Sequence, residues 1–307
     1  MRAFIIKITL FALILFTFVR FIGSADNLDS NTSKNQNIVR LNQISTIDSL
    51  DILFLGNSYT YSSIDPEYFD GIGLNTFNLG TASAGPGFYK LLADDYLTTA
   101  SRKPRLIAIC ISPTTFSVLS DNFEAYPIHR YLTTPISNEK ILLETASPKL
   151  YFDLVSKSVE KGIENLKRAE SKGEPAEPIT QRGFYPSNVV YNDNTYKETQ
   201  DFYAPLQEDS FDFEKSQQIL KLTEELRSQG VKVVFIEMPT HRLVDFLTPS
   251  FLREYESFKT RIVEDYEIIS FQGKLQNDHF RNVDHMNSAG AAIFSSYLAK
   301  QPVFSIK

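Results

Sequence analysis

The chain has 307 residues, of which 42% are hydrophobic, so it holds ample apolar material for one large domain or for a domain with an insertion. Its formal net charge is -6 and its Lys and Arg residues are scattered, which excludes the basic surface that nucleic-acid binding requires. We therefore expect a folded protein with no nucleic-acid partner.

The N-terminal segment has the pattern of an export signal. Arg2 and Lys7 precede an apolar run at residues 8–19, and small residues follow at 23–25. The run would span about 18 Å as a helix, whereas residues 3–22 would reach about 30 Å. Two alternatives stay open: a signal peptide over residues 1–25, or an uncleaved membrane anchor. Either one predicts that the rest of the chain is extracytoplasmic, secreted or membrane-anchored.

Residues 26–48 are rich in Asn, Ser and Asp, which is typical of a flexible tether, and we expect the folded domain over residues 49–307. Apolar runs in this domain have the length of strands that are buried on both faces of a parallel sheet. These runs lie at residues 51–55, 76–79, 106–111 and 232–238, with a weaker one at 266–271.

Helical patterns alternate with these runs. Residues 209–230 carry apolar side chains on one face and stop at Gly230 before the fourth strand, and residues 285–302 predict an Ala-rich closing helix. This order predicts an α/β fold with three layers, in which helices cover both faces of an open, mostly parallel sheet. Ligands of such folds bind at the carboxyl ends of the strands.

A long insertion is predicted between the third strand and the next helix, at about residues 117–208. Residues 149–173 have a solvated helical pattern, and residues 183–205 have the composition of a polar loop dense in tyrosine. Such an insertion beside the strand ends is typical of a lid or a recognition surface. We expect its tyrosines to pack the insertion onto the domain, and stacking on sugar rings is the alternative.

The first strand runs directly into Gly56, Asn57 and Ser58, which predicts a serine hydroxyl raised at the carboxyl edge of the sheet. Serine is a weak nucleophile unless a base takes its proton, and the transition state needs hydrogen-bond donors for its oxyanion. His285, in a loop before the closing helix, is the best candidate for the base.

The other histidines and the single cysteine have weaker settings. His241 follows the fourth strand and could line the same cleft, whereas His129 and His279 have no such position. Cys110 lies within the third apolar run, where we expect core packing, and a single cysteine cannot form an internal disulfide. The sequence has neither a metal-ligand cluster nor a phosphate-binding glycine loop, so we expect no metal and no cofactor.

Separate stretches of the chain resemble the SGNH, or GDSL, hydrolase superfamily. The stretch FLGNSYT is similar to the first signature block of that superfamily, FNLGTASAG to the second, and NVDHMNSAGA to the last. The likeness covers about residues 50–120 and 215–300. The stretch SIDPEYFDGIGLNTFNLG also looks like a branch of membrane-tethered bacterial proteins in this superfamily. The resemblance implies a flavodoxin-like SGNH hydrolase fold in a bacterial cell envelope.

The resemblance also implies roles for individual residues. Ser58 is the nucleophile and His285 the base, and the backbone N-H groups of Ser58 and Ser83 bind the oxyanion, with Gly80 nearby. The family usually has Gly at the position of Ser83. Thr114 occupies the position of an Asn that donates to the oxyanion in the family.

The residue three before the histidine is Asn282, where the family normally has Asp. An Asn carbonyl can accept from the imidazole and fix its tautomer, but it cannot stabilise the imidazolium with a charge. Asp284 directly precedes His285, and we expect it to point the wrong way, so it is a reserve candidate.

These features predict an extracytoplasmic serine esterase or O-acyltransferase that acts through an acyl-Ser58 intermediate on acyl esters of cell-envelope carbohydrate. Water or a sugar hydroxyl could accept the acyl group, and a transferase could have a membrane-bound acyl-transfer partner. The alternative is a catalytically silent protein of the same fold that binds an envelope glycan or supports an assembly. Asn282 and Thr114 favour this alternative, whereas Ser58 and His285 favour the enzyme.

Overall fold

The chain divides into two units, one of residues 1–39 and 123–177, and one of residues 40–122 and 178–307. The computed structural model describes Arg40, residues 43–120 and residues 182–305, all in the second unit. The predicted signal or anchor, most of the tether and the middle of the predicted insertion, including His129, lie outside the described residues. Within the described ranges, the structure has no helix with the length and apolar character that a membrane span needs.

One parallel sheet forms the centre of the second unit, with the strand order β2-β1-β3-β4-β5. The strands are β1 (Ile52–Gly56), β2 (Thr76–Gly80), β3 (Leu106–Ile111), β4 (Lys232–Glu237) and β5 (Ile268–Ser270). Every residue of β1, β2 and β3 is buried, which explains their continuous apolar runs. The predicted parallel sheet is confirmed, and its strands differ from the predicted runs by at most two residues at either end.

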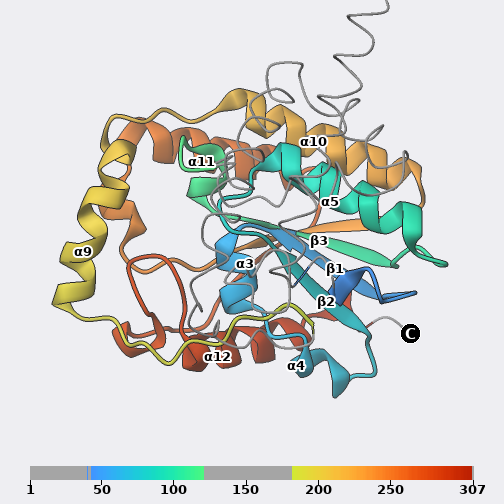
Figure 1. Ribbon diagram of the computed structural model, residues 1–307. Helices are drawn as coiled ribbons and strands as arrows, with labels where there is room; N and C mark the ends of the chain where they lie inside the picture. Colours follow the sequence, from blue (N-terminus) through green and yellow to red (C-terminus); the bar gives the residue numbers. More distant parts are fainter. Residues whose placement is uncertain (1–39, 41–42, 121–181, 306–307) are drawn as a thin grey trace, which may run out of the picture. The chain divides into compact units, whose positions relative to one another are not determined.

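Helices cover both faces of this sheet (Figure 1). One face carries α5 (Pro86–Thr99), α10 (Phe213–Ser228) and α11 (Pro249–Ile262). The other face carries α3 (Ser58–Ser63), α4 (Glu67–Asp70) and α12 (Ser288–Ala299). The predicted three-layer α/β architecture is therefore confirmed.

The two predicted helices begin and end where their caps place them. Asp212 accepts a hydrogen bond from the backbone N-H of Lys215 at 3.1 Å at the start of α10, and Gly230 follows the helix with a φ of 82°. Asn287 accepts from the N-H of Gly290 at 3.1 Å at the start of α12. The helices α5 and α11 were not predicted from the sequence, and each begins with a proline in its first turn.

The predicted polar loop at residues 183–205 contains a helix, α9 (Asp193–Tyr203), so that prediction was wrong for this part. Tyr196 and Tyr203 lie two turns apart, and both rings pack against Phe246, at centroid distances of 5.8 and 5.4 Å. Polar residues separate these rings in sequence and hide the helical period. Because Tyr203 is 2% exposed, the expected packing role holds for this tyrosine.

The fold begins before residue 49, the predicted start of the folded domain. Arg40 is 1% exposed, its Nε donates to the carbonyl oxygen of Gly183 at 2.7 Å, and its guanidinium lies 4.1 Å from the ring centroid of Tyr61. Burial lowers the pKa of Arg40 to about 10, against the opposing influence of Tyr61. The polar composition of residues 26–48 concealed this contact because an arginine can pack its stem and its planar head on an aromatic ring.

The strand order fixes where a ligand can bind. The chain leaves β1 toward β2 on one side and later returns to β3 on the other side, so the sheet has its topological switch point between β1 and β3. Ligands of open α/β sheets bind outside the carboxyl ends of the strands at such a point. Ser58 follows β1 and Thr114 follows β3, so two predicted site residues lie at this edge.

Candidate active site

A sharp turn from β1 into α3 holds Ser58. Gly56 permits the turn, because a Cβ at this position would lie 1.9 Å from Oγ1 of Thr60. Asn57 caps the helix, with its Oδ1 accepting a hydrogen bond from the backbone N-H of Tyr59 at 3.2 Å. Ser58 is therefore the first residue of α3, at the carboxyl edge of the sheet.

The end of β2 braces this turn from the side. Asn78 is completely buried and donates through Nδ2 to the carbonyl oxygen of Thr60 at 2.7 Å. A Cβ on Gly80 would lie 2.5 Å from the backbone N of Tyr61, so only glycine allows this approach of strand and helix. Gly80, expected beside the oxyanion, is thus placed in the contact between β2 and α3, and other residues line the cavity beside Ser58.

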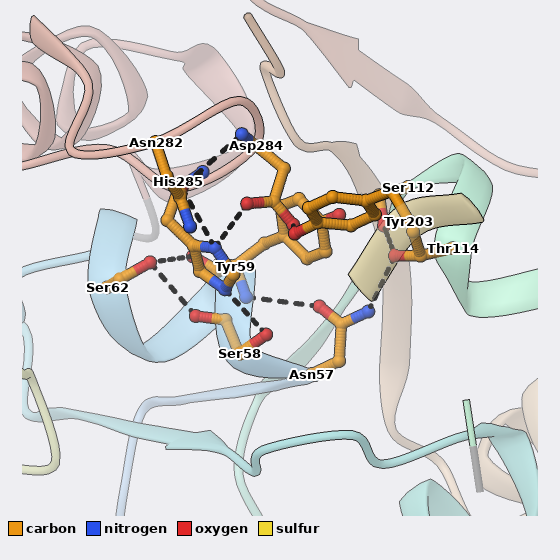
Figure 2. A network of polar contacts seen from close by, with 10 residues as sticks. All are labelled: Asn57, Ser58, Tyr59, Ser62, Ser112, Thr114, Tyr203, Asn282, Asp284 and His285. Carbon is orange, nitrogen blue, oxygen red and sulfur yellow. Dashed lines mark hydrogen bonds and ion pairs between the residues drawn. The ribbon is translucent and has the colours of Figure 1, made fainter. Parts of the chain in front are cut away.

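The base loop, residues 276–287 between β5 and α12, brings His285 to the serine. Nε2 of His285 lies 2.7 Å from Oγ of Ser58, although the two residues are 227 positions apart in sequence. Figure 2 shows the two side chains pointing toward one another from the loop and from α3. The fold therefore joins the serine and the histidine for which the sequence predicted a nucleophile and its base.

Asp284 lies at the imidazole nitrogen of His285 that faces away from Ser58. Its Oδ1 lies 2.5 Å from Nδ1 of His285, whereas Oδ1 of Asn282 lies 3.2 Å from the same nitrogen. The expectation that Asp284 points away is wrong. The reason is a tight turn in which Oδ1 of Asn282 accepts from the backbone N-H groups of His285 at 2.8 Å and of Asp284 at 3.4 Å. Asn282 shapes the loop, and the carboxylate of Asp284 takes the closer contact with the imidazole.

Asp284 is 2% exposed, and the hydroxyl of Tyr203, from α9, donates to its Oδ2. Burial by itself raises the pKa of the Asp284 carboxyl, but the charge and hydrogen bond of His285, with the hydroxyls of Tyr203 and Tyr59, hold that pKa below its ordinary value. Burial, followed by the charge of Asp284, raises the pKa of Tyr203, which therefore keeps its proton and remains a donor. The site thus contains an ionised acid at the imidazole.

Tyr59 stacks on the imidazole of His285, with ring centroids 4.9 Å apart and an interplanar angle of 10°. Tyr59 is 2% exposed, so its ring is a fixed wall that holds the imidazole plane. An aromatic face also favours a positive charge on the stacked ring. Tyr59 was not among the predicted site residues, although its position directly after the serine was a usable signal.

A cavity of about 50 Å³ lies beside Ser58, and its lining includes His285, Ser83 and Thr114. Ser83 has a φ of 54°, in the left-handed region that favours glycine. The N-H of the first residue of a helix has no intrahelical acceptor. In the described part of the chain, neither Ser58 nor Ser83 donates its N-H to another backbone group, so both stay free for an oxyanion.

Thr114 lies in the 3₁₀ turn after β3 and is 5% exposed. Its Oγ1 lies 3.0 Å from Oγ of Ser112 and 3.5 Å from Nδ2 of Asn57 (Figure 2). The hydroxyl therefore forms part of the cavity wall and joins the ends of β1 and β3.

The remaining candidates among the described residues do not line the cavity beside Ser58. His241 stacks on Phe280, with ring centroids 5.0 Å apart, and Nδ1 of His279 accepts from the backbone N-H of Gln276 at 2.9 Å. Cys110 is 1% exposed, and burial raises the pKa of its thiol to about 12, as expected for a core cysteine.

Comparison with known proteins identifies no family for this chain. No family model matches the chain, and no curated protein matches it either. Any function for the site must therefore be argued from its residues.

Proposed function

We propose that this chain is an extracytoplasmic enzyme of the SGNH type, a serine esterase or O-acyltransferase that acts on acyl esters of cell-envelope carbohydrate. One observation carries the proposal: hydrogen bonds run from Oγ of Ser58 through His285 to Asp284, at 2.7 and 2.5 Å, at the switch point of the sheet. The carbohydrate, the envelope and an SGNH-type fold are supported by the sequence resemblance and by the N-terminal pattern.

In the proposed reaction, Oγ of Ser58 attacks the acyl carbonyl carbon while Nε2 of His285 takes the hydroxyl proton. The oxyanion of the tetrahedral intermediate accepts from the N-H groups of Ser58 and Ser83. Collapse breaks the ester bond, and the leaving alkoxide takes the proton from His285. Water or a sugar hydroxyl then attacks the acyl-Ser58 ester, with His285 again acting as the base; the bond between the acyl carbon and Oγ of Ser58 breaks, and His285 returns its proton to Oγ.

Asp284 has a defined part in this cycle. It accepts from Nδ1 of His285, which fixes the tautomer that leaves Nε2 free to receive the serine proton. Its carboxylate also stabilises the imidazolium that forms during the attack. Tyr59, stacked on the same ring, supports that positive charge.

The cavity beside Ser58 supports a short acyl group. Its volume of about 50 Å³ compares with roughly 10–15 Å³ for a single water by the same kind of measure. This space suits an acetyl group better than a long acyl chain. Acetyl esters of a carbohydrate are therefore the substrates to test first.

The alternative, a catalytically silent glycan-binding or assembly protein, drew support from Asn282 in the place of an acid. That support is lost, because Asp284 reaches Nδ1 from the adjacent position. Thr114 in the place of an oxyanion-donating Asn remains in its favour. An oxyanion with fewer donors makes a slower enzyme, since one such donor contributes about 10²–10³ in rate.

Intact-mass labelling of the full chain with a fluorophosphonate tests the proposal. We expect one adduct on Ser58 in the wild type, and none in Ser58→Ala or His285→Ala. Ser63→Ala, on the same helix, is the matched control and should label like the wild type. If the folded wild type gives no adduct under conditions that label a known serine esterase, the enzyme proposal is wrong and a binding role takes its place.

A further inference from the structure

We propose that Tyr203 is a positioning residue of the site, which acts through Asp284 and extends the hydrogen-bond chain to four members. This inference rests on the proposed function. Tyr203 lies at the end of α9, in the region of the chain that the resemblance to the SGNH superfamily leaves unmatched. The insertion would thus help to position the residues of the site, in addition to its predicted role as a lid or recognition surface.

The two oxygens of Asp284 divide their contacts between two elements (Figure 2). Oδ1 faces Nδ1 of His285, and Oδ2 accepts from the hydroxyl of Tyr203. Asp284 and Tyr203 are each 2% exposed, so water cannot readily replace either partner. A carboxylate held at both oxygens has its plane fixed, and its Oδ1 stays aimed at the imidazole.

Packing restrains the ring of Tyr203. Its centroid lies 5.4 Å from that of Phe246 and 4.9 Å from that of Phe202. The chain continues into a 3₁₀ turn, Ala204–Gln207, in which Leu206 is completely buried. The hydroxyl therefore reaches Asp284 from an anchored ring, which is the arrangement required of a positioning residue.

The charged and titratable groups around Asp284 come from several elements. His285 faces it from the base loop, Tyr59 from α3 and Tyr203 from α9, while Arg281 of the base loop acts on Tyr203. A hydroxyl that donates to a carboxylate stabilises the ionised form and lowers its affinity for a proton. Removal of the Tyr203 hydroxyl should therefore let the Asp284–His285 pair bind a proton more tightly.

The test compares Tyr203→Phe with the wild type in the full chain, using the rate of fluorophosphonate labelling of Ser58 as a function of pH. The pH at which the labelling rate falls to half on the acidic side should rise by about one unit, because a hydrogen bond to a charged group is removed. Below neutral pH, the labelling rate should therefore fall about tenfold. We call this half-point the acidic midpoint. The low-field proton resonance of Nδ1-H in His285 should also shift. Tyr196→Phe, which removes a hydroxyl from the same helix, is the matched control and should leave both readouts unchanged.

A second variant keeps the test sound if Tyr203→Phe does not fold. Incorporation of 3,5-difluorotyrosine at position 203 keeps the ring and strengthens the donor, so the acidic midpoint should move to lower pH. If Tyr203→Phe only lowers the unfolding temperature and moves neither the pH midpoint nor the resonance, the hydroxyl has a packing role alone and the inference is overturned.

The two proposals can fail separately. If the wild type shows no labelling, the proposed function fails, and the Nδ1-H resonance still reports whether Tyr203 orients the pair. If the wild type labels and the pH profile of Tyr203→Phe is unchanged, the inference about Tyr203 fails by itself.

Discussion

The site has two halves that are built differently: the nucleophile turn, residues 56–63, and the base loop, residues 276–287. Nearby segments of the chain hold the start of the nucleophile turn, through the cap by Asn57 and the close approach of Gly80, and remote segments contact it further along, at Tyr61 and Ser63. Contacts with remote segments hold the base loop. The carbonyl oxygen of Val283 accepts from the N-H of Arg242 at 2.8 Å, and Tyr203 reaches Asp284 from α9.

This difference separates two ways to fix a reactive group. A strand end, a glycine and a cap place a serine reproducibly, because the backbone itself sets the position. A loop histidine has no such frame and depends on side chains that pack around it. We therefore expect changes at the base loop to act mainly on rate, and changes beneath the nucleophile turn to act mainly on stability.

The largest effect should come from Asp284→Asn, which puts an amide at Nδ1 of His285 and removes the carboxylate. We expect a loss of about 10³–10⁴ in the rate of ester cleavage or labelling, because the wrong tautomer is favoured. Asn282→Ala removes the acceptor that shapes the turn and the longer contact with the same nitrogen but keeps the carboxylate, and should cost about tenfold. Steady-state rates of both variants decide the order, and equal losses would show that Asn282 shares the role of the acid.

Gly80→Ala should give the largest loss of stability. The new Cβ would lie 2.5 Å from the backbone N of Tyr61, so α3 or β2 must move, at about 3 kcal/mol in the free energy of unfolding. Gly71→Ala is the control, because a Cβ there meets nothing within 4 Å, and it should change stability by less than about 0.5 kcal/mol. Urea unfolding measures both, and equal losses would show that β2 and α3 do not depend on the glycine.

A fall in pH should lower the free energy of unfolding through protonation of Asp284. Its pKa in the folded protein is below the ordinary value of 3.8, so the unfolded chain binds the proton more readily. This contribution is complete above the ordinary pKa and is lost as the pH falls toward the lower folded pKa. From pH 5 to pH 3, the free energy of unfolding of the wild type should fall more steeply than that of Asp284→Asn, by up to about 1.4 kcal/mol per pH unit. Parallel curves would contradict the lowered pKa.

Ser83→Gly should have the smallest effect. Relief of the left-handed φ of 54° should stabilise the protein by about 0.5–1 kcal/mol, and labelling of Ser58 should stay within about twofold because the backbone N-H remains. Ser83→Ala keeps the Cβ and should show no stabilisation. Thermal unfolding of the two variants tests the strain, and a large loss of labelling in both would assign a role to the Ser83 hydroxyl.

Much of the fold was predictable because its signals are local. The buried strands appear as uninterrupted apolar runs, and α10 has both its apolar face and its terminal glycine in the sequence. The helix α9 escaped prediction because its packing residues stand among polar ones and its partner, Phe246, lies on a distant turn. Arg40 escaped for the same reason, since its partner ring belongs to Tyr61.

The sequence by itself determined the strand–glycine–serine turn, the loop that carries His285, and the sheet edge at which both lie. Only the tertiary structure decided which carboxylate lies against the imidazole. The turn shaped by Asn282 directs Asp284 toward the imidazole of His285, and the hydroxyl of Tyr203 of α9 donates a hydrogen bond to its carboxylate. Backbone geometry and hydrophobic periodicity are short-range properties that a sequence displays directly. The partner of a buried carboxylate is set by packing between segments far apart in the chain, and no local pattern records it.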